Sequence, residues 1–114
     1  MIKTKKTGEA KMKKVINGKL YDTDTAEKIF YHYSSGISYN DFRYFSETLY
    51  KKKTGEFFLN GEGGAMSKYA EHCGNNCMRS NTKNIPLSEQ EAKDYFEKYL
   101  TFEEYEKHFG KVEE

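Results

Sequence analysis

The alternation of hydrophobic and polar positions along the chain predicts two β-hairpins. Within residues 13–21, two short mixed segments flank Asn17-Gly18. Asn-Gly favours a type I′ hairpin turn because both central residues of that turn need a positive φ. Residues 42–59 have the same character over longer arms, which are rich in aromatic and β-branched residues. Gly55, after three lysines, stands where a longer hairpin loop favours a left-handed residue.

A helix is predicted between the two hairpins. Asp24 is suited to the N-cap position, and Glu27, three residues on, completes a pair that resembles a capping box. The sequence predicts that this helix ends at Ser34-Ser35-Gly36. Apolar residues recur in it at i, i+3, i+4 and i+7, the spacing of one helix face: Ala26, Ile29, Phe30 and Tyr33.

Two further helices are predicted near the C-terminus. Ser88 with Glu91 forms a capping box, and Thr101 with Glu104 repeats the device thirteen residues on. Gly110 is suited to end the second helix. The apolar faces are Ala92, Tyr95, Phe96, Tyr99 and Leu100 in the first helix, and Phe102, Tyr105 and Phe109 in the second.

The order of these elements predicts the fold class. Residues 60–84 are rich in Gly and Asn, and we expect an irregular connection there with a single turn at 66–71. Ile85-Pro86-Leu87 is expected to form a short strand at a sheet edge, because Pro has no N–H to donate. We therefore predict a single-domain α+β fold, in which an antiparallel β-sheet of two hairpins plus a short strand packs with about three α-helices.

Composition fits one small folded domain. The chain has 114 residues and a formal net charge of +1, with ten Tyr and eight Phe. An aromatic residue can bury its ring and keep a polar tip in water, so an aromatic core is feasible despite the low hydrophobicity. Residues 1–14 hold six Lys and one Glu, and such charge blocks are usually mobile. We predict a basic, mobile extension over residues 1–11 and a single α+β domain over residues 12–114.

The sequence also predicts a cytoplasmic location. No apolar run approaches the roughly 20 residues that a membrane helix needs, and the Lys-rich start is not followed by the apolar stretch of a signal peptide. Two Cys are too few for a disulfide scaffold, and reduced thiols fit a cytosolic chain.

The two cysteines are candidate metal ligands. Cys73 and Cys77 lie in a loop rich in Gly and Asn, which can bring both thiolates to one tetrahedral zinc ion. Two more ligands are needed: His72 is nearest in sequence, and His32 or His108 would have to come from elsewhere in the fold. We predict one structural zinc ion held by Cys73, Cys77, His72 and His32. Two unliganded thiols and a disulfide are the alternatives.

Two other patterns of the sequence bear on chemistry. Gly61-Glu62-Gly63-Gly64 could cradle a phosphate, but the Walker and dinucleotide spacings are absent and Glu62 adds negative charge. A turn that needs positive φ explains these glycines better. The spacing of Cys, His and carboxylates selects no nucleophile–base pair, so we expect no enzymatic activity.

A basic, aromatic surface is the basis of a nucleic-acid hypothesis. Arg43 and Lys51-Lys52-Lys53, with the N-terminal lysines, are interleaved with Tyr39, Tyr44 and Tyr50, a combination that can stack bases and hold phosphates. Only two Arg occur in the chain, and its pI is near 7.7. A Lys-rich hairpin tip is also a common way to keep a sheet edge soluble.

The sequence resembles a family of roughly hundred-residue proteins from mobile elements of Gram-positive bacteria. The resemblance covers about residues 12–114, and residues 1–11 look like an extension dispensable for the fold. The segments that carry it are KKVINGKLYDTDTA at 13–26, ETLY at 47–50, FFL at 57–59, GEGGAMSKYA at 61–70 and IPL at 85–87.

This resemblance implies a setting, the cytoplasm of a bacterial host, and it transfers no functional residues. Small phage proteins of this kind include anti-CRISPR proteins, which inactivate an RNA-guided nuclease by occluding it. We therefore expect a protein partner, a type II CRISPR effector nuclease, whose guide or target loading is blocked. Residues 88–114, with nine acids and four Lys, could imitate phosphates locally. The alternative is a small nucleic-acid-binding regulatory protein of a mobile element.

Overall fold

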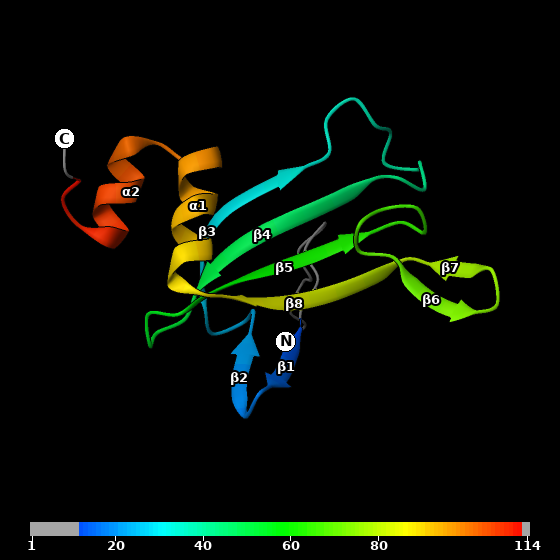
Figure 1. Cartoon of the computed structure of the whole chain (residues 1–114), viewed down its shortest axis with the longest axis horizontal. Helices are drawn as coiled ribbons and strands as arrows, with labels where there is room; N and C mark the ends of the chain where they lie inside the picture. Colours follow the sequence, from blue (N-terminus) through cyan, green and yellow to red (C-terminus); the bar gives the residue numbers. More distant parts are fainter. Residues whose placement is uncertain (1–11, 113–114) are drawn as a thin grey trace, which may run out of the picture.

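The computed structural model describes residues 12–112, and the extension predicted over residues 1–11 lies outside them. Within this part the chain forms eight strands followed by two helices (Figure 1). The strands are β1 (Lys13–Ile16), β2 (Lys19–Asp22), β3 (Glu27–Tyr33), β4 (Phe45–Lys51), β5 (Phe57–Gly63), β6 (Glu71–Gly74), β7 (Cys77–Arg79) and β8 (Asn81–Leu87). The helices are α1 (Glu89–Tyr99) and α2 (Phe102–Phe109). Neither helix is long and apolar enough to cross a membrane.

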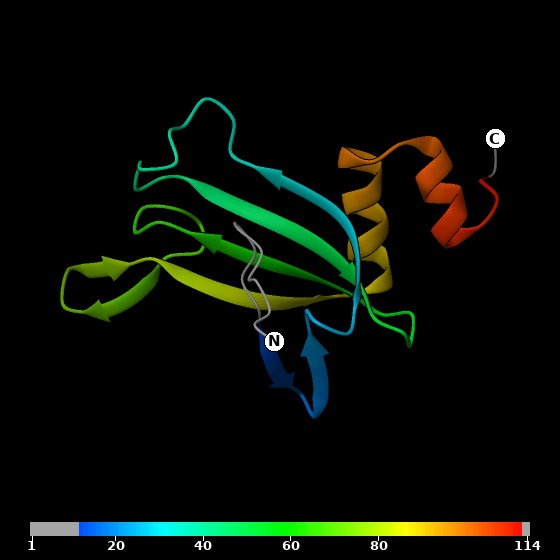
Figure 2. The same ribbon diagram turned by 180° about the vertical axis from the view of Figure 1, so that it is seen from behind.

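A four-stranded antiparallel sheet organises the molecule. Its strand order is β3-β4-β5-β8, while β1 with β2 and β6 with β7 form separate hairpins. Both views place the helices at one end of this sheet (Figures 1 and 2). The loop 34–44, the turn 64–70 and the β6–β7 hairpin lie at the opposite end. We call this opposite end the open end.

The core has two parts, one on each face of the sheet. On the helix-covered face, Leu49, Phe57 and Leu59 pack with Ala92 and Phe96 of α1. On the other face, the β1–β2 hairpin places Tyr21 against Tyr50 and Phe58. Successive strand residues point to opposite faces, so the neighbours Phe57 and Phe58 serve different clusters. The chain thus uses both faces of one sheet, and its aromatic residues supply most of the buried material.

Several predicted elements are confirmed. The fold class is α+β with antiparallel sheets, and Asn17 and Gly18 take the positive φ values of 53° and 79° that the first hairpin turn needs. The second hairpin pairs β4 with β5. β8, which contains Pro86, lies at the sheet edge. Ser88 and Glu91 form the complete capping box of α1, and Thr101 caps α2.

Two predictions are wrong. The helix expected after Asp24 is a strand, β3, so the described residues contain two helices and not about three. Residues 60–84 were expected to be irregular, yet β5, β6, β7 and β8 take up most of them. The single turn expected at 66–71 is replaced by successive turns over residues 65–69.

Candidate functional site

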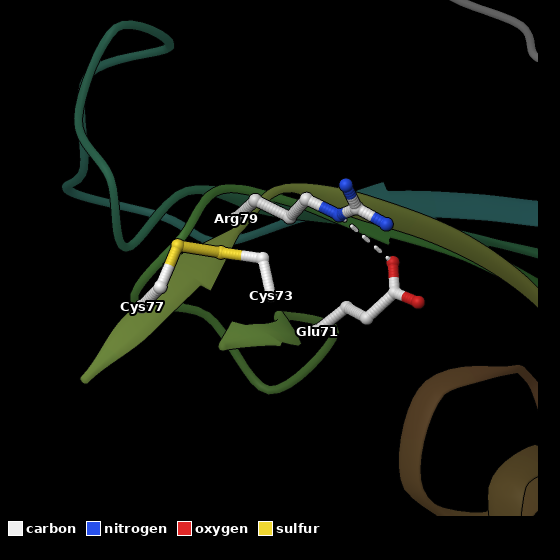
Figure 3. Close-up of a disulfide and its surroundings, with 4 residues drawn as sticks. All are labelled: Glu71, Cys73, Cys77 and Arg79. Carbon is white, nitrogen blue, oxygen red and sulfur yellow. Dashed lines mark hydrogen bonds and ion pairs between the residues drawn. A yellow bond between two sulfur atoms is a disulfide. The ribbon is translucent and has the colours of Figure 1, made fainter. Parts of the chain in front are cut away.

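The two predicted cysteine ligands lie in the β6–β7 hairpin, where they are joined by a disulfide (Figure 3). Their Cα atoms are 5.1 Å apart, and Arg79 Nε donates a hydrogen bond to Glu71 Oε1 at 3.2 Å beside them. All of residues 71–80 are exposed. Zinc binds thiolates, so the zinc prediction applies to the reduced protein and stays a prediction.

The predicted histidine ligands are not gathered around these cysteines. His72 is the neighbour of Cys73 in β6. His32 lies in β3 and uses its ring elsewhere: its Nε2 is 2.8 Å from Glu47 Oε1, and its ring stacks on Tyr99 at 4.5 Å. Residues 12–112 contain no group of three or more His, Cys, Asp or Glu that could hold a metal ion.

Glu47 is the centre of a buried polar network that the sequence did not indicate. Its side chain is 2% exposed on the helix-covered face of β4. Besides His32, it receives the ammonium of Lys68, with Nζ 2.6 Å from Oε2, and the hydroxyl hydrogen bond of Tyr69. Tyr95 of α1 donates to Oε1 at 3.4 Å. One carboxylate therefore ties β3, the turn 64–70 and α1 to the centre of the sheet.

The network controls the protonation of its members. Burial would raise the pKa of Glu47, but the hydrogen bonds from Lys68, Tyr69 and His32 outweigh burial and lower it. Burial and the adjacent Glu47 carboxylate raise the pKa of Tyr69 far above its usual range. Glu47 thus stays ionised and Tyr69 stays a neutral donor. Every group is paired, and the Glu47 carboxylate at the centre is buried, which fits a structural role.

The glycine-rich segment is needed for close packing, not for a turn of positive φ. Gly61 and Gly63 belong to β5, and neither they nor Gly64 has a positive φ. A Cβ on Gly61 would fall 2.1 Å from Tyr69 Cζ, and one on Gly64 would fall 2.4 Å from the carbonyl oxygen of Phe42. The glycines therefore let the turn 64–70 lie directly on the sheet and deliver Lys68 and Tyr69 to Glu47.

The open end carries most of the exposed large hydrophobic side chains of the described residues. Tyr39 is 78% exposed, Phe42 66% and Tyr33 56%. With Tyr31, Met66 and Met78, six exposed large hydrophobic side chains lie at the open end. The rest of residues 12–112 holds four. Large exposed apolar groups in one region mark interaction sites more often than scattered ones do.

Three of these exposed residues form a cluster with the half-buried Tyr44, held by contacts between the rings. We name Tyr31, Tyr33, Tyr39 and Tyr44 the tyrosine cluster. The Tyr44 ring stacks on Tyr33 with centroids 6.1 Å apart and meets the edge of Tyr39 at 5.2 Å. Burial and the hydroxyl of Tyr31 raise the pKa of Tyr44 to about 12, so its hydroxyl remains protonated at neutral pH.

The structure divides the predicted basic, aromatic surface. Tyr39 and Tyr44 lie at the open end, whereas Tyr50 is 5% exposed and packs in the core. The Lys51-Lys52-Lys53 tip lies at the opposite end of β4. There Glu56 binds Lys52 at 2.9 Å and Lys19 of β2 at 2.6 Å. The lysines and tyrosines that the sequence interleaves are therefore not one surface.

The acids of the C-terminal helices are largely used in helix caps and short-range pairs. Glu91 accepts from Ser88 N at 2.8 Å, and Glu89 pairs with Lys93 at 3.3 Å. Glu104 lies 3.8 Å from His108 Nε2. Acidic residues at helix N-termini complement the helix dipole, which accounts for much of this local charge.

Fold and surface together define a small α+β protein with a four-stranded antiparallel sheet and an aromatic open end. No family model, no curated protein and no solved structure matches the chain significantly. Sequence reasoning named Tyr39 and Tyr44 but not Tyr31 and Tyr33, which it assigned to a helix. Only the strand assignment of residues 27–33 brings the four rings together.

Proposed function

We propose that this protein binds another protein through its open end, and that the partner is a type II CRISPR effector nuclease whose guide or target DNA loading it blocks. The observation that carries the proposal is the tyrosine cluster with Phe42: large, exposed aromatic side chains supported by a sheet. The choice of a nuclease rests on the resemblance to small mobile-element proteins.

The aromatic surface favours a protein partner for energetic reasons. Tyr residues provide large contact area with few rotatable bonds and are enriched among residues that dominate binding energy. Here the rings are already held by Tyr44 in stacked and edge contacts. Little side-chain entropy is then lost on association, and more of the buried area contributes to affinity.

Occlusion fits the charge of the chain better than imitation of a whole nucleic acid. The formal net charge is +1, and DNA carries one charge per about 1.7 Å of helix axis. Acidic residues of α1 and α2 are partly engaged by their own caps. We infer that the protein acts as a wedge that prevents movement or loading, with at most a local acidic contact.

A cleavage assay tests the proposal. A guide-loaded type II nuclease is mixed with target DNA, and the protein is added before or after the DNA, or before the guide. The expected result is inhibition at near-stoichiometric protein that depends on the order of addition, which identifies the blocked step. No inhibition across several such nucleases would contradict the proposal.

Variants connect the assay to the open end. Tyr39→Ala and Tyr33→Ala should each weaken inhibition by about tenfold, because central Tyr residues commonly contribute that much to an interface. Phe102→Ala in α2 is the matched control, since Phe102 is 59% exposed at the other end. Equal loss in Phe102→Ala would show that the open end is not the surface used.

A further inference from the structure

A cavity of about 390 Å³ opens beside the tyrosine cluster. It lies where the loop 34–44, the end of β5 and the start of β8 meet, and Tyr39, Asp41, Tyr44, Glu62 and Thr82 line it together with the backbone of Gly63-Gly64. The volume is at the small end of the range for ligand sites, roughly 300–1,000 Å³. It suits one long side chain better than a drug-sized molecule.

The charged groups of the cavity are unbalanced. Its lining contains two carboxylates and no Lys, Arg or His. Asp41 is already neutralised by Arg43, through Nε to Oδ1 at 3.0 Å and a terminal nitrogen to Oδ2 at 2.8 Å. Within residues 12–112, Glu62 accepts a single long hydrogen bond, from Thr82 Oγ1 at 3.4 Å, and forms no ion pair. A half-buried carboxylate with this much unused acceptor capacity attracts a cationic donor.

The aromatic lining indicates which kind of cationic donor the cavity would bind. Tyr39 is 78% exposed and its ring meets the Tyr44 ring edge-on at 5.2 Å. A cation placed over a tyrosine face is attracted by the ring quadrupole. A guanidinium can stack on such a face and donate two parallel hydrogen bonds to a carboxylate, whereas an ammonium does neither as well. Glu62 and Tyr39 therefore fit arginine better than lysine.

We propose that this cavity receives the guanidinium of an arginine side chain from the protein partner, with Glu62 as its ion-pair acceptor and Tyr39 as its stacking surface. The inference rests on the proposed function only for the source of the arginine. Proteins that hold a guide–target duplex do so in positively charged channels. Capture of one channel arginine would remove a phosphate contact at the same time as the partner is bound.

A peptide titration tests the cavity without any nuclease. The ¹⁵N-labelled protein is titrated with acetyl-Gly-Arg-Gly-amide and with two matched peptides, in which arginine is replaced by citrulline, its neutral isostere, or by lysine. The expected result is saturable shifts of the Gly63, Gly64 and Thr82 amides with the arginine peptide, with a dissociation constant on the order of 1–10 mM. The citrulline and lysine peptides should bind at least about fivefold more weakly.

Variants assign the binding to the proposed groups. Glu62→Gln should weaken the arginine peptide by about tenfold, and Tyr39→Ala, at an exposed position, should weaken it without a risk to folding. Glu103→Gln, an exposed acid at the start of α2, is the control and should bind as the parent does. Equal shifts with the arginine and citrulline peptides, or no saturable shifts, overturn the inference.

The same variants in the cleavage assay separate this inference from the proposed function. Nuclease inhibition that is unaffected by Glu62→Gln, with no arginine-peptide binding, overturns the inference and leaves the proposed function standing. Selective arginine-peptide binding with no nuclease inhibited supports the inference and contradicts the proposed function. Selective peptide binding together with inhibition weakened by Glu62→Gln supports both.

Discussion

At the scale of single residues, Glu47 and the glycines of β5 explain how the turn 64–70 is held against the sheet. Glu47 is buried, yet it holds Lys68 and Tyr69 from the turn 64–70. Gly61 makes room for the Tyr69 ring that reaches it. A charged group buried with full hydrogen bonding specifies one arrangement of its partners, because any other arrangement leaves the charge unpaired. The turn is thereby fixed where it supports the aromatic surface.

The lowered pKa of Glu47 predicts how stability depends on pH. A carboxyl whose pKa is lower in the folded state than in the unfolded chain stabilises the fold above the unfolded value. That stabilisation is lost as the pH falls from about 4.3, the ordinary glutamate value, through the lower value of the folded state. We expect Glu47→Gln to cost about 2 kcal/mol of unfolding free energy at pH 7. As the pH falls below about 4.3, the unfolding free energy of the Glu47→Gln variant should decline less steeply than that of the parent protein. Urea unfolding at several pH values would measure this.

Glu103→Gln is the control, because it also removes one negative charge but at an exposed position. Its stability should depend on pH as that of the parent does. A parent-like acid profile in Glu47→Gln would mean that other carboxylates, such as Glu56 with its pKa lowered to about 2 by Lys19 and Lys52, carry the whole acid dependence.

Gly61→Ala should destabilise the protein by overpacking. The added Cβ would lie 2.1 Å from Tyr69 Cζ, so either the ring or the turn must move, at a cost of about 1–3 kcal/mol. A double-mutant cycle with Tyr69→Ala isolates the contact. The cost of Gly61→Ala should fall sharply once the ring is absent. An unchanged cost would indicate that the strand itself, and not the ring, requires glycine.

At the scale of elements, β3 shows why the spacing of apolar residues after Asp24 wrongly predicted a helix. Ile29 and Phe30 are consecutive, and both pack against the helix-side core because the register shifts between Lys28 and Phe30. A bulge of this kind brings neighbouring side chains to one face, which mimics the i+3, i+4 pair of a helix. Ala26 packs on the opposite face, against Tyr21 and its neighbours. Tertiary pairing with β4 thus overrides the helical spacing.

The expected N-cap of that helix has a local explanation too. Asp22 makes the side-chain bond of this turn: its Oδ1 accepts from Asp24 N at 2.9 Å, and its carbonyl oxygen accepts from Ala26 N at 3.2 Å. Asp and Asn favour such tight turns as readily as helix caps. The helix caps at Ser88 and Thr101 are predictable because each precedes a full apolar helix face with no competing strand partner.

The open end could not be derived from the sequence, because its parts come from separate elements. The loop 34–44, the end of β5 and the start of β8 meet only through sheet order, which the sequence does not state. The role of Gly61, Gly63 and Gly64 was equally hidden. The close approach of the Tyr69 ring to Gly61 follows no fixed spacing in the sequence and so leaves no periodic pattern.

The disulfide hairpin should be a local element of stability. Cys73 and Cys77 are four residues apart, and closing so short a loop is worth at most about 2 kcal/mol in the chain-entropy account. We expect Cys73→Ser with Cys77→Ser to alter amide shifts of residues 71–80 and to leave the β3-β4-β5-β8 sheet unchanged in an NMR spectrum. Loss of sheet signals would contradict this.

The zinc prediction is tested on the same pair of proteins. Metal analysis of the reduced parent should find one zinc ion per chain that the double variant lacks. The absence of zinc from reduced parent protein prepared with zinc present would make the prediction wrong.

At the scale of the whole molecule, the lysine-rich tip and the aromatic surface are separated, and at the open end Arg43 and Lys68 are paired with Asp41 and Glu47. The tyrosine cluster occupies one end of the sheet, and the Lys51-Lys52-Lys53 tip lies at the other, about 20 Å away for seven extended residues. Glu56 binds Lys19 and Lys52 there. Stacking of bases on aromatic rings works with a cationic groove that follows the backbone, so this separation favours a protein partner over a nucleic acid.

Salt dependence turns this argument into a measurement. A protein that neutralises several phosphates loses roughly 10³–10⁵ in affinity between about 50 and 200 mM salt. With Lys19 and Lys52 already paired, we expect binding to a DNA duplex no tighter than about 10⁻⁴ M at physiological salt. Binding to the nuclease should change far less over the same range, because aromatic burial is not screened. A variant lacking residues 1–11, which hold four of the N-terminal lysines, should weaken the residual DNA binding and leave inhibition intact. Tight, steeply salt-dependent DNA binding that survives Tyr39→Ala would instead identify a nucleic-acid-binding regulator.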